Sequence, residues 1–152
     1  MVTPLKNRAS DGHEPGAPLR YSATWASPDT PVSDARVAVR ELLARAGHHP
    51  HHRPSQDAQL VVSELVTNAV RHAPGPVGLV LEVSPDAGLL RITVSDTSPR
   101  TPEPRPRDPH RVGGHGLNLV ARLCGRLYTV TQDTGKHVVA HLHLRRPASP
   151  EP

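Results

Sequence analysis

The sequence is poor in aromatic residues and almost without cysteine. Its 152 residues include no phenylalanine, one tryptophan, two tyrosines and one cysteine. The core of such a chain must consist mainly of valine, leucine and alanine. A single cysteine, Cys124, excludes a disulfide scaffold and any metal site built from several cysteines. The length fits one domain that can still bury a sizeable core.

Long hydrophobic segments are also lacking. No apolar run approaches the roughly 18–20 residues that a membrane-spanning helix needs. The polar N-terminus has no hydrophobic segment of the kind found in signal peptides. We therefore expect a cytoplasmic protein without a membrane partner.

Positive charge exceeds negative charge, but not in a pattern that indicates nucleic acid. Lysine and arginine number 18 against 14 acidic residues, which gives a formal net charge of +4. The basic residues are scattered, and three aromatic residues are too few for a base-stacking platform. The abundance of arginine, alanine and proline fits GC-rich coding better than selection for a polyanionic partner.

Proline is abundant and clustered. The chain has 18 prolines, about twice the roughly 8 expected at a usage near 5%. Their positions predict a disordered arm over residues 1–18 and a disordered tail over residues 146–152. Residues 97–113 contain five prolines and cannot form a regular element. One domain is expected over residues 19–145, with this loop inside it.

Hydrophobic periodicity predicts the regular elements of that domain. The order is strand, two helices, two strands, the long loop, a helix and two strands. This order predicts an α/β fold, a two-layer sandwich with a mixed, mostly antiparallel sheet and its helices on one face. Strands are expected at 19–25, 77–83, 90–96, 127–131 and 137–144, and helices from Pro31 to Gly47, from a Ser55 cap to Pro74, and at 117–123.

Four histidines surround Pro50 between the first two predicted helices. They are His48, His49, His51 and His52. A metal site is one interpretation. The segment has no regular geometry and no neighbouring carboxylate, which favours a solvated loop.

Glu64 and Asn68 are the first candidate functional feature. Their i,i+4 spacing puts both side chains on one side of the second predicted helix. Asparagine is a poor residue inside a helix, because it competes with the backbone for hydrogen bonds. The pair suits a carboxylate base beside a metal-coordinating amide, and a solvated helix face explains it equally well.

Asp96 is the second feature, because it continues the apolar face of its strand at the strand's last position. A buried carboxylate needs hydrogen-bond donors. Backbone amides in a turn before Ser98 and Pro99 are one source, and this is the commoner arrangement. The N–H of a ligand is the other.

A glycine-rich entry into the third helix is the third feature, with Gly113, Gly114 and Gly116 around His115. Glycines let a phosphate approach the backbone, and the free N–H groups and the helix dipole attract it. Glycine also serves plain turns. Since no Gly-Lys-Ser/Thr follows and no strand precedes, neither a Walker A motif nor a Rossmann fingerprint is present.

In this order the three features resemble the GHKL superfamily, which includes histidine-kinase catalytic domains, gyrase and mismatch-repair ATPases. Residues 62–72 resemble its N box, residues 94–100 a modified first glycine box, and residues 114–120 the second. The short length, with a strand and helix before the N box, is most similar to the stand-alone anti-sigma-factor-type serine kinases of high-GC bacteria. The resemblance covers about residues 19–144.

The resemblance implies a Bergerat fold with an ATP pocket that uses Mg²⁺. Asn68 would bind Mg²⁺, Glu64 would be the catalytic base that deprotonates a partner's serine, and Asp96 would accept the N–H of the adenine amino group. Residues 97–113 would form the ATP lid. The nucleotide-binding residues it implies are Glu64, Asn68, His72, Asp96, Ser98, Gly114, His115, Gly116 and Leu117.

Two departures from the family pattern concern the adenine side. The first glycine box, normally Asp-X-Gly-X-Gly, has no glycine between Asp96 and Arg100. The late Gly-X-Thr pattern, whose threonine usually helps to hold adenine, is here Gly135, Lys136 and His137. Both changes bear on affinity and turnover more than on the fold.

The function expected from this resemblance is that of a serine/threonine kinase that regulates transcription. It would phosphorylate a serine on an anti-anti-sigma (STAS-type) partner and could sequester a sigma factor, and a homodimer is left open. The alternative is a non-catalytic nucleotide-binding interaction module.

Overall fold

The computed structural model describes residues 19–26, 31–72, 75–98 and 116–144. The predicted arm over 1–18 and the predicted tail over 146–152 lie outside the described residues. Most of the predicted lid, together with Gly114 and His115, also lies outside them.

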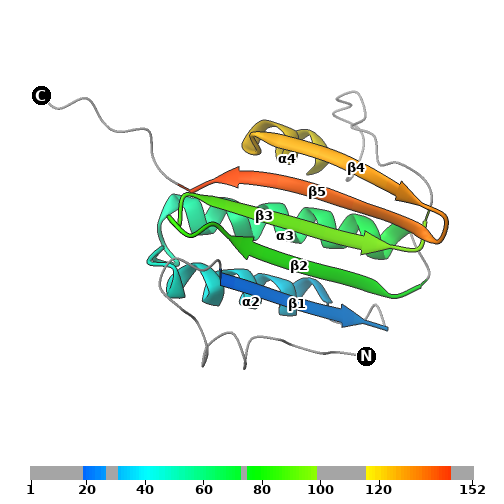
Figure 1. The fold of residues 1–152 in the computed structure, drawn as a ribbon, viewed down its shortest axis with the longest axis horizontal. Coiled ribbons are helices and arrows are strands. Elements are labelled where there is room, and N and C mark those ends of the chain that lie inside the picture. The colour runs from blue at the N-terminus through cyan, green and yellow to red at the C-terminus, as the bar shows by residue number, and fades with distance from the viewer. Residues whose placement is uncertain (1–18, 27–30, 73–74, 99–115, 145–152) are drawn as a thin grey trace, which may run out of the picture.

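A five-stranded sheet forms one layer of the molecule (Figure 1). Its strands lie in the order β1-β2-β3-β5-β4. All four described pairs are antiparallel, so the parallel pairing expected of a mixed sheet is not found among them. Two helices connect β1 to β2, and the chain therefore returns running opposite to β1. The strands are β1 (Leu19–Trp25), β2 (Val77–Val83), β3 (Leu89–Asp96), β4 (Arg126–Gln132) and β5 (Gly135–His143).

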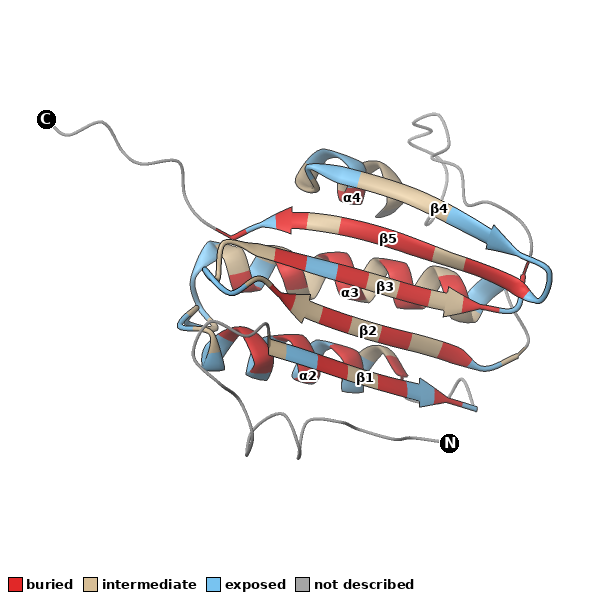
Figure 2. Cartoon of the chain, in the orientation of Figure 1, coloured by how far each residue is buried: buried red, intermediate tan, exposed pale blue. Residues whose placement is uncertain are grey.

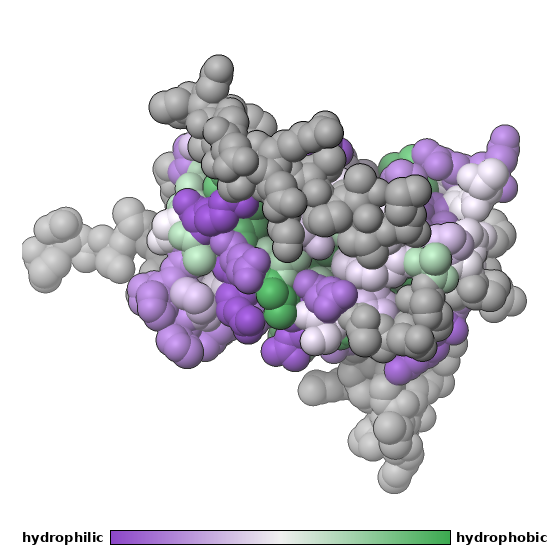
Figure 3. Space-filling model, turned by 90° about the horizontal axis from the view of Figure 1, so that it is seen from below, coloured by the Kyte–Doolittle hydropathy of each residue, from purple (hydrophilic) through white to green (hydrophobic). Residues whose placement is uncertain are grey.

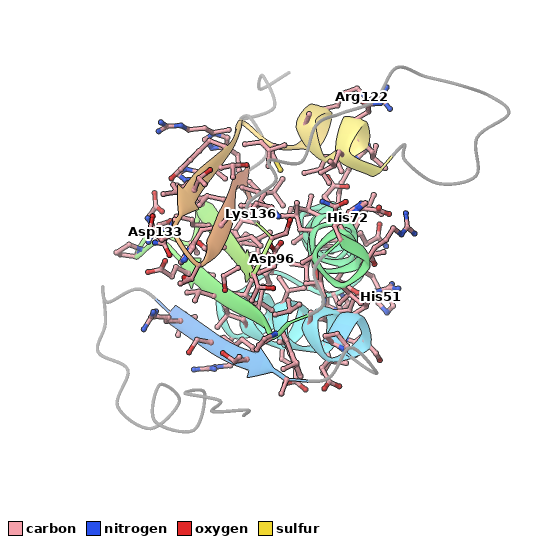
Figure 4. The ribbon with its side chains drawn as sticks, turned by 90° about the vertical axis from the view of Figure 1, so that its right-hand side faces the viewer. His51, His72, Asp96, Arg122, Asp133 and Lys136 are labelled. Atoms are coloured by element: carbon pink, nitrogen blue, oxygen red, sulfur yellow. The ribbon has the colours of Figure 1, made fainter. Side chains whose placement is uncertain are left out.

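Three helices form the second layer. They are α2 (Pro31–Arg45), α3 (Arg53–His72) and α4 (Gly116–Leu123). Figure 4 shows all three on the same side of the sheet, which confirms the predicted two-layer sandwich. In the part of the chain that the structure describes, no helix combines the length and the apolar character needed to cross a membrane.

The start of α3 differs from the prediction. We expected Ser55 to cap the helix, whereas α3 already begins at Arg53. Pro54 fits there because a proline in the first helical turn lacks only an N–H that would have no partner. Ser55 is fully buried, and its hydroxyl accepts a hydrogen bond from Nε2 of Gln59 at 3.2 Å.

The core between the two layers is almost wholly aliphatic, as the scarcity of aromatic residues predicts. Burial alternates along β2, where every second residue from Val77 to Val83 is buried. Figure 2 shows buried residues along the central strands and along α2 and α3 behind them. The largest fully buried side chains are Leu43, Leu79, Leu81, Leu90, Ile92, Leu144, Val39, Val61, Val62, Val66, Val83 and Val94.

His48 joins the connection between α2 and α3 to the turn between β2 and β3. Its Nε2 lies 2.7 Å from the carbonyl oxygen of Ala87. Ala87 has a left-handed backbone with φ of 59°, which is uncommon for a residue with a side chain. One of the four loop histidines therefore has a structural contact that holds a strained turn in place.

The surface over β1 and α2 is mainly hydrophilic. Figure 3 views the molecule from this side, with a small hydrophobic area among polar residues where grey atoms do not cover it. Among the described residues, the large hydrophobic side chains that are exposed are Val37 and Val130. Isolated residues of this kind are normal on a folded surface.

Candidate functional site

The predicted site residues come from elements that meet at one end of the molecule. Figure 1 shows the C-terminal ends of α3 and β3 and the first residues of β5 at the same, right-hand end. Helix α4 packs against α3 in the same layer. The fold therefore brings the N box, the end of β3 and the second glycine box into one region.

Asp96 occupies the position that the alternation predicts. It is the last residue of β3, it is 7% exposed, and it follows the buried residues Leu90, Ile92 and Val94 on the helix side of the sheet. Its Oδ1 accepts a hydrogen bond from the backbone N–H of Ser98 at 2.8 Å. The turn that we considered as the commoner explanation for this carboxylate is therefore present.

Lys136 is the residue of this region that sequence reasoning missed. Its Nζ lies 2.9 Å from each carboxylate oxygen of Asp96, and both side chains are almost fully buried. The two residues are direct partners in the β3–β5 ladder, and Figure 4 labels them between the sheet and the helices. The ammonium also donates to the carbonyl oxygen of Ser98 at 3.3 Å.

A signal for this contact was present in the sequence. We expected the last strand to begin at residue 137, whereas β5 begins at Gly135. Extending the alternation of Val138, Ala140 and Leu142 back by one step places Lys136 on the same, core-facing side. The pairing with Asp96 follows only from the register of two strands that are 40 residues apart in the sequence.

Glu64 and Asn68 lie one turn apart on α3, and both are half-buried. Helical geometry places them beside the seam that Val61 and Leu65 bury against the core. Among the described residues, Glu64 forms no hydrogen bond or ion pair. A half-buried carboxylate and amide at this spacing supply oxygen atoms of the kind that Mg²⁺ prefers.

The remaining predicted residues lie on α3, β3 and α4. His72 is the exposed last residue of α3, and Ser98 is buried beside Asp96. Gly116 is the first residue of α4, and Leu117 is half-buried against the core. The described half of the second glycine box thus opens a helix, whose first N–H groups have no partner within the helix.

The two ends of a nucleotide fit these residues unequally. The side-chain oxygen atoms of Glu64 and Asn68 on α3 suit a metal ion. The free N–H groups at the start of α4 suit phosphates. The adenine end fits less well, because Asp96 already accepts hydrogen bonds from Lys136 and from Ser98. The carboxylate that should receive the adenine amino group is largely satisfied by the protein itself.

Other candidate sites in the described regions are weaker. The described residues contain no group of three or more histidine, cysteine, aspartate or glutamate side chains that could hold a metal ion. A shallow hollow of about 320 Å³ lies on the sheet face that the helices leave uncovered, lined in part by Arg20, Glu82, Arg91, Tyr128 and His137. It is separate from the candidate site, which lies on the opposite face.

Comparisons with known proteins agree with this fold. No curated protein sequence matches the chain. Among solved structures, the RsbU and RsbW domains of Rv1364c from Mycobacterium tuberculosis match with a TM-score of 0.60 and 22% identity, over 86% of this chain and 33% of that chain. This chain thus covers about a third of the length of that solved chain, and the match shows a shared fold.

A second solved structure is the histidine kinase domain of a blue-light activated histidine kinase from Erythrobacter litoralis. It matches with a TM-score of 0.44 and 20% identity, over 92% of this chain and 70% of that chain.

The family model described as a histidine kinase-like ATPase domain matches residues 24–142, which is most of the chain. The protein therefore belongs to the histidine kinase-like ATPase domain family.

Proposed function

We propose that this protein is an Mg²⁺- and ATP-binding cytoplasmic regulator that phosphorylates a serine on a partner protein. The observation that carries the proposal is the half-buried pair Glu64 and Asn68 in the C-terminal half of α3. Membership of the histidine kinase-like ATPase family supports ATP as the nucleotide.

In this proposal, Asn68 and the start of α4 hold the metal and phosphate end of the nucleotide. The side-chain oxygen of Asn68 binds Mg²⁺, and the N–H groups around Gly116 and Leu117 donate to phosphate oxygens. The bound metal would neutralise charge on the phosphates during transfer. His72, Ser98, Gly114 and His115 complete the proposed nucleotide-binding set, and residues 97–113 form its lid.

Glu64 is the proposed general base. Its carboxylate takes the proton from the serine hydroxyl as the serine oxygen bonds to the γ-phosphorus and ADP leaves. Among the described residues Glu64 has no ion pair, and a carboxylate without one suits this role better than a paired carboxylate, because a nearby cation would reduce its basicity. General-base catalysis contributes about 10²–10⁴-fold to a rate.

The proposed partner is an anti-anti-sigma protein of the STAS type, with a sigma factor as a second partner. This assignment rests on the resemblance of residues 19–144 to the anti-sigma-factor-type serine kinases. A non-catalytic module that binds nucleotide is the competing function. The Asp96–Lys136 contact favours that alternative, because it weakens the adenine end of the proposed site.

Incubation with γ-labelled ATP and a panel of candidate STAS proteins tests the proposal. Phosphoserine on one partner, dependent on Mg²⁺ and on Glu64, supports the kinase. Glu41→Gln is the matched control, because Glu41 is an exposed glutamate on α2 and should transfer at the wild-type rate. Nucleotide binding without transfer to any partner supports the module, and absence of nucleotide binding contradicts both functions.

A further inference from the structure

The hydrogen bonds of the Asp96–Lys136 pair leave little room for a ligand. A lysine ammonium has three N–H groups, and Lys136 directs them to Oδ1 of Asp96, to Oδ2 of Asp96 and to the carbonyl oxygen of Ser98. A carboxylate offers about four accepting positions. Of these, the N–H of Ser98 fills one and the two contacts with Lys136 fill two more.

Burial makes this pair costly to open. The side chains of Lys136 and Asp96 are 3% and 2% exposed. Separating two buried charges leaves each without the partner that offsets its lost hydration. A purine amino group that approaches Asp96 must therefore compete with a cation that already occupies the carboxylate, or use the one position on Oδ2 that the described residues leave open.

We propose that Lys136 acts as an internal ligand of Asp96 and thereby determines how far the site distinguishes one nucleobase from another. The inference rests on the proposed nucleotide-binding function and deepens it. The site holds a nucleotide mainly through its phosphates and metal, and the base adds little to affinity or selectivity. Removing the ammonium of Lys136 frees Asp96 to accept the amino group of adenine.

Adenine and guanine differ in the group that they present to a carboxylate, so the ratio of the affinities for ATP and GTP is the quantity to measure. Adenine presents a donor amino group to a carboxylate, whereas guanine presents a carbonyl oxygen at the equivalent ring position. A freed Asp96 attracts the first and repels the second, and a site that hydrogen-bonds one base discriminates strongly against a base that leaves its polar group unpaired. The phosphates are the same in both, so a structural change elsewhere leaves the ratio of the two affinities unmoved.

The test measures the Kd values of Mg·ATP, Mg·GTP and Mg·tripolyphosphate by calorimetry at pH 8. Wild type should bind the two nucleotides within about 3-fold of each other, since a base without a free partner contributes little. Lys136→Met keeps the length of the side chain without its charge. It should raise the preference for ATP over GTP by about 10-fold or more, the effect of a hydrogen bond to a charged group, with tripolyphosphate affinity unchanged.

Two further variants keep the test decisive. Lys136→Gln retains a donor to Asp96 and should raise the ATP preference by a smaller factor, and it replaces Lys136→Met as the deciding variant if the methionine variant fails to fold. Arg45→Met removes the same charge from the exposed end of α2 and should leave the ratio unchanged.

The outcomes separate this inference from the proposed function. Strong ATP selectivity in wild type, or an unchanged ratio in a folded Lys136 variant that still binds tripolyphosphate, overturns the inference and leaves the proposed function standing. If wild type binds neither tripolyphosphate nor either nucleotide, the proposed function itself is wrong and the inference falls with it.

Discussion

Gly135 lies so close to Asp96 that no other residue fits at its position. A Cβ atom built on Gly135 would lie 2.0 Å from the carbonyl oxygen of Asp96, and the φ of Gly135 is +153°. The backbones of the first residue of β5 and the last residue of β3 are thus in close contact. In the same register, Lys136 pairs directly with Asp96 and lies beside its carboxylate.

We predict that Gly135→Ala destabilises the fold by about 2 kcal/mol or more, because the backbone of β3 must move to admit the methyl group. The free energy of unfolding in urea measures this loss. Gly47→Ala is the control, since Gly47 also has a positive φ, +94°, but nothing lies within 4 Å of its Cβ position. It should cost only about 1 kcal/mol, the cost of a left-handed backbone for a residue with a Cβ, and equal losses in the two variants would show that the contact with Asp96 is unimportant.

Most of the fold could be predicted from local patterns. The alternation in β1 and β2 and the 3.6-residue repeat of α2 gave their limits to within about two residues, because each has one face in a single aliphatic core. The start of α3 was less accurate, because Ser55 has the chemistry of a cap and the structure instead buries it. Local sequence cannot distinguish these two uses of a serine hydroxyl.

The candidate site could be predicted only in part. Glu64, Asn68 and Asp96 stand out because polar residues beside or within an apolar pattern are costly and need a reason. Lys136 did not stand out, since its importance depends on which strand lies next to β5. The sheet order, in which β3 and β5 are neighbours although α4 and β4 separate them in the sequence, is a tertiary property.

A second prediction concerns the metal. Asn68→Ala should abolish the tightening of ATP binding by Mg²⁺ and leave the far-UV circular dichroism spectrum unchanged. Gln56→Ala, at an exposed position in the first turns of the same helix, is the control and should keep the full Mg²⁺ effect. Calorimetric titrations of ATP with and without Mg²⁺ measure this effect. An undiminished Mg²⁺ effect in the Asn68 variant would contradict the assignment of Asn68 as a metal ligand.

A third prediction concerns pH and His141, whose ring lies 5.8 Å from that of Tyr128. Desolvation, Arg126, Arg91 and His143 lower the pKa of His141 below its ordinary value of 6.5. Below pH 6.5 the unfolded chain therefore takes up a proton that the folded chain resists, so the folded state loses stability as the pH falls.

His141→Gln should remove this part of the pH dependence. One proton corresponds to at most about 1.4 kcal/mol per pH unit. Urea denaturation at pH values from neutral downward should thus give a shallower slope for the variant than for wild type. His51→Gln, at an exposed loop histidine, is the control, and its slope should equal that of wild type. If the free energy of unfolding depends on pH equally in wild type and in the His141 variant, the prediction is wrong.

A fourth prediction uses Cys124, which directly follows α4. Burial raises the pKa of its thiol from 9.0 to about 11. The thiolate is the reactive form, so at pH 8 the folded protein should react with iodoacetamide about 100-fold more slowly than the unfolded chain does in urea. Similar rates in the two states would mean that the end of α4 is not packed against the core.

In the proposed function, Glu64 acts as the base in phosphoryl transfer and need not contact the phosphates of bound ATP before transfer begins. The most direct test is the single-turnover rate of phosphoryl transfer to a partner serine, measured for wild type and Glu64→Gln at saturating Mg·ATP. Glu64→Gln keeps the shape of the side chain but cannot take the proton. The account predicts a rate at least about 10²-fold lower with ATP affinity within a few-fold of wild type. Equal transfer rates in the two proteins would contradict it.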